Sequence, residues 1–153
     1  MNKLILGVLA SLAVATPALA DEARIEARGG IVWTSGATQD VYGAAAGYDW
    51  DLGPSTFGGL EVSADKIGAS GLGLNIGATG RFGIKAGPKT KIFVDGGYTV
   101  NTCVGCDDSF HAGGGVEVGL APKVYGKLGY RHYFRSSGAQ DYDAAVVGIG
   151  LRF

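Results

Sequence analysis

Hydrophobic and polar residues alternate along the last twelve residues of the chain, which begin at Tyr142. Counted back from the end, Phe153, Leu151, Ile149 and Val147 form an apolar row with a period of two. Strict alternation over this length is typical of a β-strand with one apolar face. The chain is therefore predicted to end in a strand whose last residue is aromatic.

Seven earlier segments show the same alternation of apolar and polar positions. In the clearest of them, Leu74, Ile76 and Phe82 alternate with Asn75 and Arg81. Together with the terminal segment, these predict eight strands, near residues 23–33, 41–50, 60–65, 72–85, 91–100, 110–120, 124–134 and 142–153.

The prolines that follow position 20 divide the chain into equal lengths. Pro54, Pro88 and Pro122 are 34 residues apart, and each lies in a turn-forming stretch between two alternating segments. A unit of this length holds two strands and a loop, so four units predict four hairpins. The fold prediction is an all-β, eight-stranded, antiparallel, up-and-down barrel. Its proline turns lie at one end and its four loops at the other, near residues 35–39, 66–71, 101–109 and 135–141.

Residues 1–20 have the organisation of a secretory signal peptide. Lys3 precedes a mostly apolar run, and the small residues Ala18 and Ala20 match the pattern of a cleavage site. This predicts export through the general secretory pathway and a mature barrel domain of residues 21–153.

Alternation alone does not show whether water or lipid surrounds the strands, because the strands of a soluble β-sandwich also alternate. A second criterion is therefore needed. Aromatic residues gather near both ends of the apolar faces. Trp33, Tyr98 and Phe110 are near the loops, whereas Trp50 and Phe82 are near the proline turns. Two aromatic girdles separated by aliphatic residues match the two interfaces of a bilayer. We therefore predict a transmembrane barrel.

The terminal strand resembles the C-terminal strand of bacterial outer-membrane β-barrels, in which a final Phe and alternate apolar residues form the assembly signal. The matching positions are Val147, Ile149, Leu151 and Phe153. The whole pattern is similar to small eight-stranded barrels of the opacity-protein, OmpX and OmpA-barrel type. The resemblance implies a Gram-negative outer membrane, contact with its lipid and lipopolysaccharide, and insertion by periplasmic chaperones and the barrel-assembly machinery. It also implies that both ends of the mature chain lie in the periplasm.

Composition and charge exclude several other classes. The 28 glycines argue against long helices, and after Ala20 no apolar run is long enough for a transmembrane helix. Without Lys3, 12 basic and 14 acidic residues remain, which is a net charge of about −2. The chain therefore lacks the basic field expected of a nucleic-acid-binding protein.

The polar faces of the strands carry the charged residues. An eight-stranded barrel has an interior that side chains fill, and buried charges there must pair or stay hydrated. The alternation predicts a lumen network of Arg24, Glu26, Arg28, Glu61, Asp65, Arg81, Asp95, Glu117, Lys127 and Arg131. Such a network plugs the lumen, and the alternative is a narrow conduit for small solutes. A general diffusion pore would need many more strands.

Cys103 and Cys106 are the two cysteines of the chain, and both lie in the predicted third loop. In an oxidising compartment a disulfide is the expected state of such a pair. A metal site is the alternative, with Asp107 or Asp108 and His111 as further ligands. However, His111 falls on the inward face of its strand, so no metal and no cofactor is predicted.

His132 is the residue that raises the question of catalysis. The stretch around it resembles the His-Tyr-Ser segment of outer-membrane lipid A deacylases, in which the Ser two positions after the His is the catalytic partner. That position here is Phe134. Without the nucleophile, acyl transfer has no evident chemistry. The sequence therefore favours a non-enzymatic envelope protein, a structural barrel or surface antigen, over a small-solute porin or a lipid A-modifying enzyme. No motif identifies an extracellular ligand.

Overall fold

The computed structural model describes residues 21–153 apart from residues 69–72, 104–105 and 137–138. The predicted signal peptide and Leu72 lie outside the described residues. No helix in the described part is long and apolar enough to cross a membrane. Eight strands are present: β1 (Glu22–Thr34), β2 (Ala37–Asp51), β3 (Thr56–Ile67), β4 (Leu74–Lys85), β5 (Thr90–Asn101), β6 (Ser109–Ala121), β7 (Val124–Arg135) and β8 (Tyr142–Arg152).

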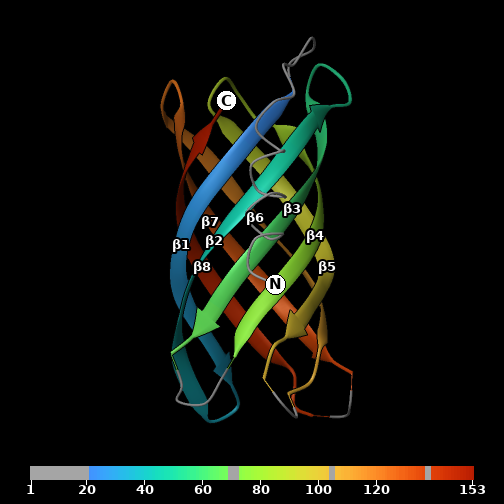
Figure 1. Cartoon of the computed structure of the whole chain (residues 1–153). Helices are drawn as coiled ribbons and strands as arrows, with labels where there is room; N and C mark the ends of the chain where they lie inside the picture. Colours follow the sequence, from blue (N-terminus) through green and yellow to red (C-terminus); the bar gives the residue numbers. More distant parts are fainter. Residues whose placement is uncertain (1–20, 69–72, 104–105, 137–138) are drawn as a thin grey trace, which may run out of the picture.

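Each strand pairs antiparallel with the next along the chain, and β8 closes the barrel by pairing with β1 (Figure 1). At this seam Ile25 lies opposite Leu151, and Ala27 lies opposite Ile149. The eight-stranded antiparallel up-and-down barrel predicted from the alternation is therefore confirmed.

The register between the strands fixes their tilt. Following paired residues once around the barrel from Glu22, through Asp49, Arg81 and Arg131, leads back to β1 at Val32. The path is displaced by ten residues, since it leaves at position 22 and returns at position 32. In an eight-stranded barrel a stagger of this size tilts the strands by roughly 40° from the axis.

The turns and loops lie at opposite ends of the barrel, but one loop is shorter than predicted. The connection expected over residues 35–39 consists only of Ser35 and Gly36, because Thr38 pairs with Trp33 and extends the strands. Gly36 has a φ of 146°, a conformation that an L side chain rarely adopts, which permits the tight two-residue turn. The proline turns lie at the end where β8 finishes, at the top of Figure 1.

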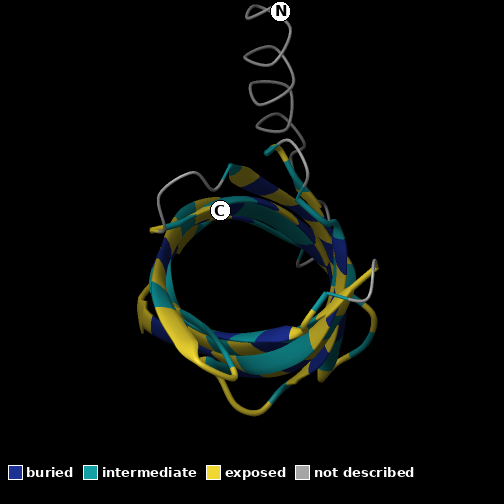
Figure 2. Cartoon of the chain, turned by 90° about the horizontal axis from the view of Figure 1, so that it is seen from below, coloured by how far each residue is buried: buried dark blue, intermediate teal, exposed yellow. Residues whose placement is uncertain are grey.

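Burial is inverted relative to a soluble protein. Among the described residues, 16 polar or charged side chains are buried, whereas only seven apolar ones are. Exposed and buried positions alternate around the ring of strands (Figure 2). Large apolar side chains such as Val94, Leu128 and Val147 keep about 60% of their surface exposed on the outside. A continuous apolar exterior around a polar interior is the arrangement of a barrel immersed in lipid.

Aromatic pairs border this apolar exterior at both ends. Near the loops, the Tyr98 and Phe110 rings meet edge to face with centroids 4.9 Å apart. Near the proline turns, the Tyr48 and Trp50 rings are 5.3 Å apart. The Tyr98 hydroxyl also donates a hydrogen bond of 3.1 Å to Asp108. Rings with an apolar body and a hydrogen-bonded tip suit the boundary between lipid and water.

Candidate functional site

The strands direct an ionic network into the lumen. Among the described residues, sixteen side chains form ion pairs there, and the eight cations balance the eight anions. The cations are Arg24, Arg28, Arg81, Lys85, Lys91, Lys127, Arg131 and Arg152, and the anions are Glu22, Glu26, Asp49, Asp51, Glu61, Asp65, Asp95 and Glu117. The structure brings together all ten residues that the sequence assigned to the network.

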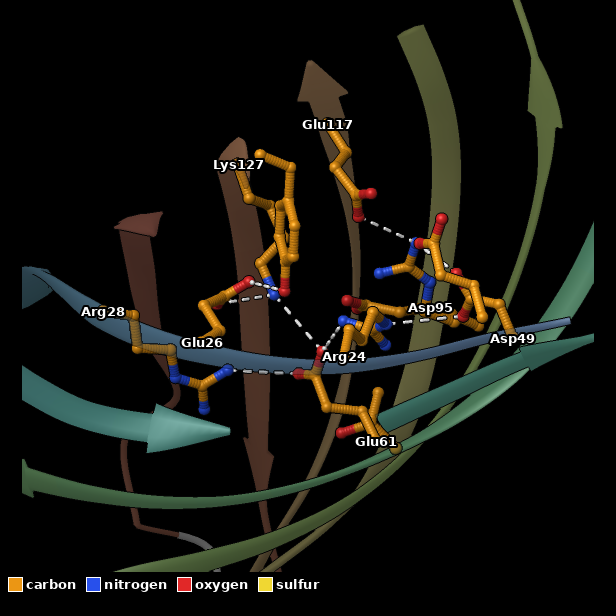
Figure 3. A network of polar contacts seen from close by, with 12 residues as sticks. Arg24, Glu26, Arg28, Asp49, Glu61, Asp95, Glu117 and Lys127 are labelled. Atoms are coloured by element: carbon orange, nitrogen blue, oxygen red, sulfur yellow. Dashed lines mark hydrogen bonds and ion pairs between the residues drawn. The ribbon is translucent and has the colours of Figure 1, made fainter. Parts of the chain in front are cut away.

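Glu61 on β3 is the centre of this network (Figure 3). Its Oε2 lies 2.8 Å from Arg24 Nη1 and 3.2 Å from Lys127 Nζ. Its Oε1 lies 3.1 Å from Arg28 Nη1 and 3.0 Å from Arg131 Nη2. The Glu61 side chain is only 1% exposed, so one buried carboxylate connects β1, β3 and β7. We call Glu61 and these four cations the Glu61 cluster.

Arg81 on β4 forms a second centre nearer the proline turns. Its Nη2 lies 3.1 Å from Asp49 Oδ2 on β2 and 3.1 Å from Glu117 Oε2 on β6. The guanidinium carbon also lies 5.0 Å from the centre of the Phe57 ring and 4.5 Å from that of Phe93. Aromatic faces attract a desolvated cation, so the two rings and two carboxylates fix Arg81 in the lumen.

Glycines on intervening strands let these charges meet. Arg24 and Glu61 flank Gly47 in the register, and a Cβ on Gly47 would lie 2.7 Å from Arg24 Nη2. Asp49 and Arg81 likewise flank Gly59, where a Cβ would clash with the Asp49 carboxylate. Real side chains do not approach this closely. Each of these ion pairs therefore crosses above a strand that has no side chain at the crossing point.

Several lumen residues were absent from the predicted network. Glu22 accepts a hydrogen bond of 2.8 Å from Lys91, and Phe57 and Phe93 are buried against Arg81. The alternation contained the signal for Phe93, which lies between the inward-facing Lys91 and Asp95. Apolar character alone therefore does not assign a residue to the lipid-facing side.

A disulfide joins Cys103 and Cys106 in the third loop. His111 does not join that pair in a metal site. Its imidazole lies inside the barrel, with Nε2 3.0 Å from Thr79 Oγ1 and Nδ1 3.1 Å from Thr99 Oγ1. In the described part of the chain, no three metal-ligating side chains are grouped to hold an ion.

His132 lies on the outward face of β7 and pairs with a carboxylate on β8. Its Nδ1 is 2.7 Å from Asp143 Oδ1, which also accepts a hydrogen bond of 2.5 Å from the Tyr130 hydroxyl. The Phe134 ring packs edge to face on the imidazole, with centroids 4.6 Å apart. The position where a deacylase carries its serine is thus filled by an apolar ring.

The four residues assigned to the assembly signal form one outward row, three on β8 and Phe153 directly after it. Val147 and Phe153 are each 60% exposed, Ile149 is 58% exposed and Leu151 is 42% exposed. The Phe153 backbone N–H donates a hydrogen bond of 2.9 Å to the Ala23 carbonyl at the start of β1. The last residue therefore lies at the barrel seam with its ring directed outward.

No protein-family model and no curated protein matches the sequence. Solved structures do share its fold. The N-terminal barrel domain of OprF from Pseudomonas aeruginosa has a TM-score of 0.65 at 17% identity, and the match covers 86% of this chain and 97% of that one. Ail, the attachment invasion locus protein of Yersinia pestis, has a TM-score of 0.60 at 12% identity, covering 88% and 99%.

A third similar structure is the outer-membrane enzyme PagL, with a TM-score of 0.62 at 15% identity and coverage of 83% and 97%. The chain therefore has the fold of small eight-stranded transmembrane barrels. Because identities are this low and one of these neighbours is an enzyme, the shared fold does not fix the activity.

Proposed function

We propose that the chain is a non-enzymatic protein of the Gram-negative outer membrane, with a lumen closed by ionic side chains and an envelope or surface role. The Glu61 cluster is the observation that supports this proposal most strongly. In it, nitrogen atoms of four cations on β1 and β7 lie 2.8–3.2 Å from the carboxylate oxygens of one residue on β3. Paired charges that fill an eight-stranded lumen favour a plug over a pore.

The membrane location follows from the apolar exterior and the aromatic girdles. In this environment the barrel contacts outer-membrane lipid and lipopolysaccharide. Periplasmic chaperones and the barrel-assembly machinery insert it there. The outward row that ends at Phe153 supplies the proposed assembly signal. The disulfide of Cys103 and Cys106 suits the oxidising side of the inner membrane.

A membrane fractionation experiment tests the location. The full chain, expressed in a Gram-negative host, is expected in the outer membrane as a band whose electrophoretic mobility changes on heating. Recovery in the soluble or inner-membrane fraction would contradict the proposal.

Lipid A modification is the second candidate, and the hydrogen bond between His132 and Asp143 favours it. A carboxylate that orients an imidazole is part of many hydrolytic sites, but the nucleophile is also required. Phe134 occupies the expected position, so we propose that the pair serves only the lipid interface. Mass spectrometry of lipid A from cells with the unmutated chain, with His132→Ala and without the protein is expected to give identical acylation patterns. If lipid A from cells with the unmutated chain lacks an acyl chain that is present with His132→Ala, the chain is a lipid A-modifying enzyme instead.

A further inference from the structure

Lys89 and Lys123 lie at the end of the barrel that carries the proline turns, at the top of Figure 1. Each follows a turn proline directly, immediately before β5 or β7, and both residues are exposed. In the described part of the chain neither side chain forms an ion pair, whereas Lys85 and Lys91 nearby do. Arg152, the last residue of β8, lies at the same end. We call Lys89, Lys123 and Arg152 the turn-end cations.

Gly119 on β6 brings these residues together. Its backbone N–H donates a hydrogen bond of 2.7 Å to the Lys89 carbonyl. A Cβ on Gly119 would lie 3.6 Å from Lys89 Cβ and 2.5 Å from Arg152 Nη2, so both side chains border the space that Gly119 leaves empty. The Arg152 backbone N–H donates a hydrogen bond of 2.9 Å to the Lys123 carbonyl, which places the third cation beside the other two.

The anions nearby compensate the turn-end cations only in part. Glu22 lies 3.5 Å from Arg152 Nη1 but 2.8 Å from Lys91 Nζ, so one carboxylate serves two cations. Arg152 Nε is buried without a hydrogen-bond partner, and Nη2 has no acceptor among the described residues. The carboxylate of Phe153 forms no ion pair within the described chain. The Arg152 guanidinium therefore has N–H groups left for another acceptor.

Asp21, the remaining anion at this end, lies on the other side of the barrel. Its carboxylate accepts hydrogen bonds of 3.3 Å from the Tyr48 hydroxyl and the Asp51 backbone N–H, which hold it at β2. The turn-end cations lie over β5–β8, and β2 is opposite β6 in the closed barrel. A positive potential therefore remains on the β5–β8 side, where it attracts an anion from outside the chain.

Exposed apolar residues adjoin the turn-end cations. Phe153 follows Arg152 directly, and Leu120 precedes Lys123 by three residues in the same turn region. Both are 60% exposed and lie on the outward side of the barrel. Cations next to an outward apolar surface suit an amphiphile, whose anionic head contacts the charges while its hydrocarbon chain covers the apolar residues. A small inorganic anion would use the cations alone.

We propose that the turn-end cations bind the phosphate of an anionic phospholipid in the adjoining leaflet, with its acyl chains against Leu120 and Phe153. The inference rests on the proposed membrane location of the barrel. The two lysines act as flexible point charges toward the phosphate, and the Arg152 guanidinium donates directed hydrogen bonds to it. Phosphatidylglycerol carries one net negative charge and has this chemistry, whereas the ammonium of phosphatidylcholine cancels its phosphate.

Native mass spectrometry of the refolded full-length barrel tests this assignment. The protein in detergent is mixed with equal amounts of phosphatidylglycerol and phosphatidylcholine that have identical acyl chains, and the bound lipids are counted. We expect phosphatidylglycerol to be retained over phosphatidylcholine by about fivefold or more, as a lysine near an anionic headgroup contributes roughly this factor. Inorganic phosphate at the same concentration as the lipid should not displace it.

Two variants separate a local site from the general charge of the protein. The double variant Lys89→Gln, Lys123→Gln keeps the length of both side chains nearly unchanged and removes two charges, so the preference for phosphatidylglycerol should be largely lost. Lys66→Gln is the matched control, because Lys66 is an exposed lysine at the loop end of β3. It should keep the preference of the unmutated chain.

Several results would overturn the assignment. These are equal retention of the two lipids, an unchanged preference in the folded double variant, and an equal loss in Lys66→Gln. Displacement of the lipid by inorganic phosphate would likewise overturn it, because the acyl chains would then contribute nothing. The double variant should still fractionate with the outer membrane, so a failure of the lipid site is distinguishable from a failure of the proposed location.

Discussion

Glu61 and Lys127 meet across the lumen at 3.2 Å although they lie on opposite strands, β3 and β7, and are 66 residues apart. Lys91 on β5 and Glu22 on β1 repeat this relationship at 2.8 Å near the proline turns. Backbone hydrogen bonds hold only neighbouring strands together. These ion pairs therefore brace the barrel across its diameter and occupy the path that a solute would take.

Neutralising Glu61 should destabilise the barrel more than any other single change in the lumen. Glu61→Gln keeps the size of the side chain but removes the charge that compensates four cations. Removing one partner of a buried ion pair typically costs about 3–5 kcal/mol. Reversible urea unfolding in lipid vesicles measures the free energy of unfolding.

The control for this experiment lies two residues along the same strand. Ser63 is buried and inward-facing, but in the described part of the chain it forms no ion pair. Ser63→Ala should change the free energy of unfolding by less than about 1 kcal/mol. Equal losses in the two variants would mean that Glu61 matters only for packing.

The glycines beneath the ion pairs should not tolerate a methyl group. A Cβ on Gly47 would lie 2.7 Å from Arg24 Nη2 and 2.7 Å from the Leu60 carbonyl oxygen. Gly47→Ala is therefore expected to cost about 1–3 kcal/mol in the same assay. Gly129 is also on an inward position, but a Cβ there would be 3.8 Å from its nearest neighbour, the Gly114 oxygen. Gly129→Ala should be neutral or slightly stabilising, and the reverse order would refute the crossing-point explanation.

The apolar exterior should reject charge at mid-height. Val94 is 63% exposed on the outside of β5, between girdles at either end. Val94→Arg should cost roughly 2–4 kcal/mol if the side chain faces the centre of the bilayer. Lys66→Arg, on the outward face near the loops, is the control and should be neutral. A neutral Val94→Arg would contradict immersion in lipid.

Loss of the terminal aromatic residue should impair insertion. Deletion of Phe153 removes an outward ring that is 60% exposed, together with the N–H that bonds to Ala23 at the seam. In pulse-labelled cells, unfolded chains are expected to accumulate in the periplasm. The membrane fraction should then contain less of the folded, heat-modifiable form of the protein. Phe153→Tyr keeps an aromatic ring and should insert normally. Normal insertion of the deletion variant would remove Phe153 from the assembly signal.

The sequence predicted the barrel well because one period governs the whole chain. Alternation in every segment and proline turns 34 residues apart are local signals, and strand number and lumen-facing positions follow from them. The first loop was predicted too long because Thr38 and Gln39 are polar, whereas their pairing with Trp33 and Val32 continues the strands beyond the apolar residues.

Pairing within the lumen could be predicted only as a set of charges. Which cation meets Glu61 depends on the ten-residue stagger and on the empty space above Gly47, and neither is readable from one segment alone. Phe93 escaped prediction because an apolar residue on an inward position breaks the simple division into apolar and polar faces. Phe57 escaped it because the third strand was predicted only over residues 60–65, whereas β3 begins at Thr56.

Single-channel recording of the refolded, unmutated protein in planar lipid bilayers tests the closed lumen most directly. Because Glu61, Arg81 and their partners fill the interior with paired charges, conductance is expected to be absent, or small and intermittent. Glu61→Gln leaves its four cations to be hydrated, so its conductance should equal or exceed that of the unmutated protein. A large, steady conductance in the unmutated protein would contradict the account and identify the barrel as a narrow porin.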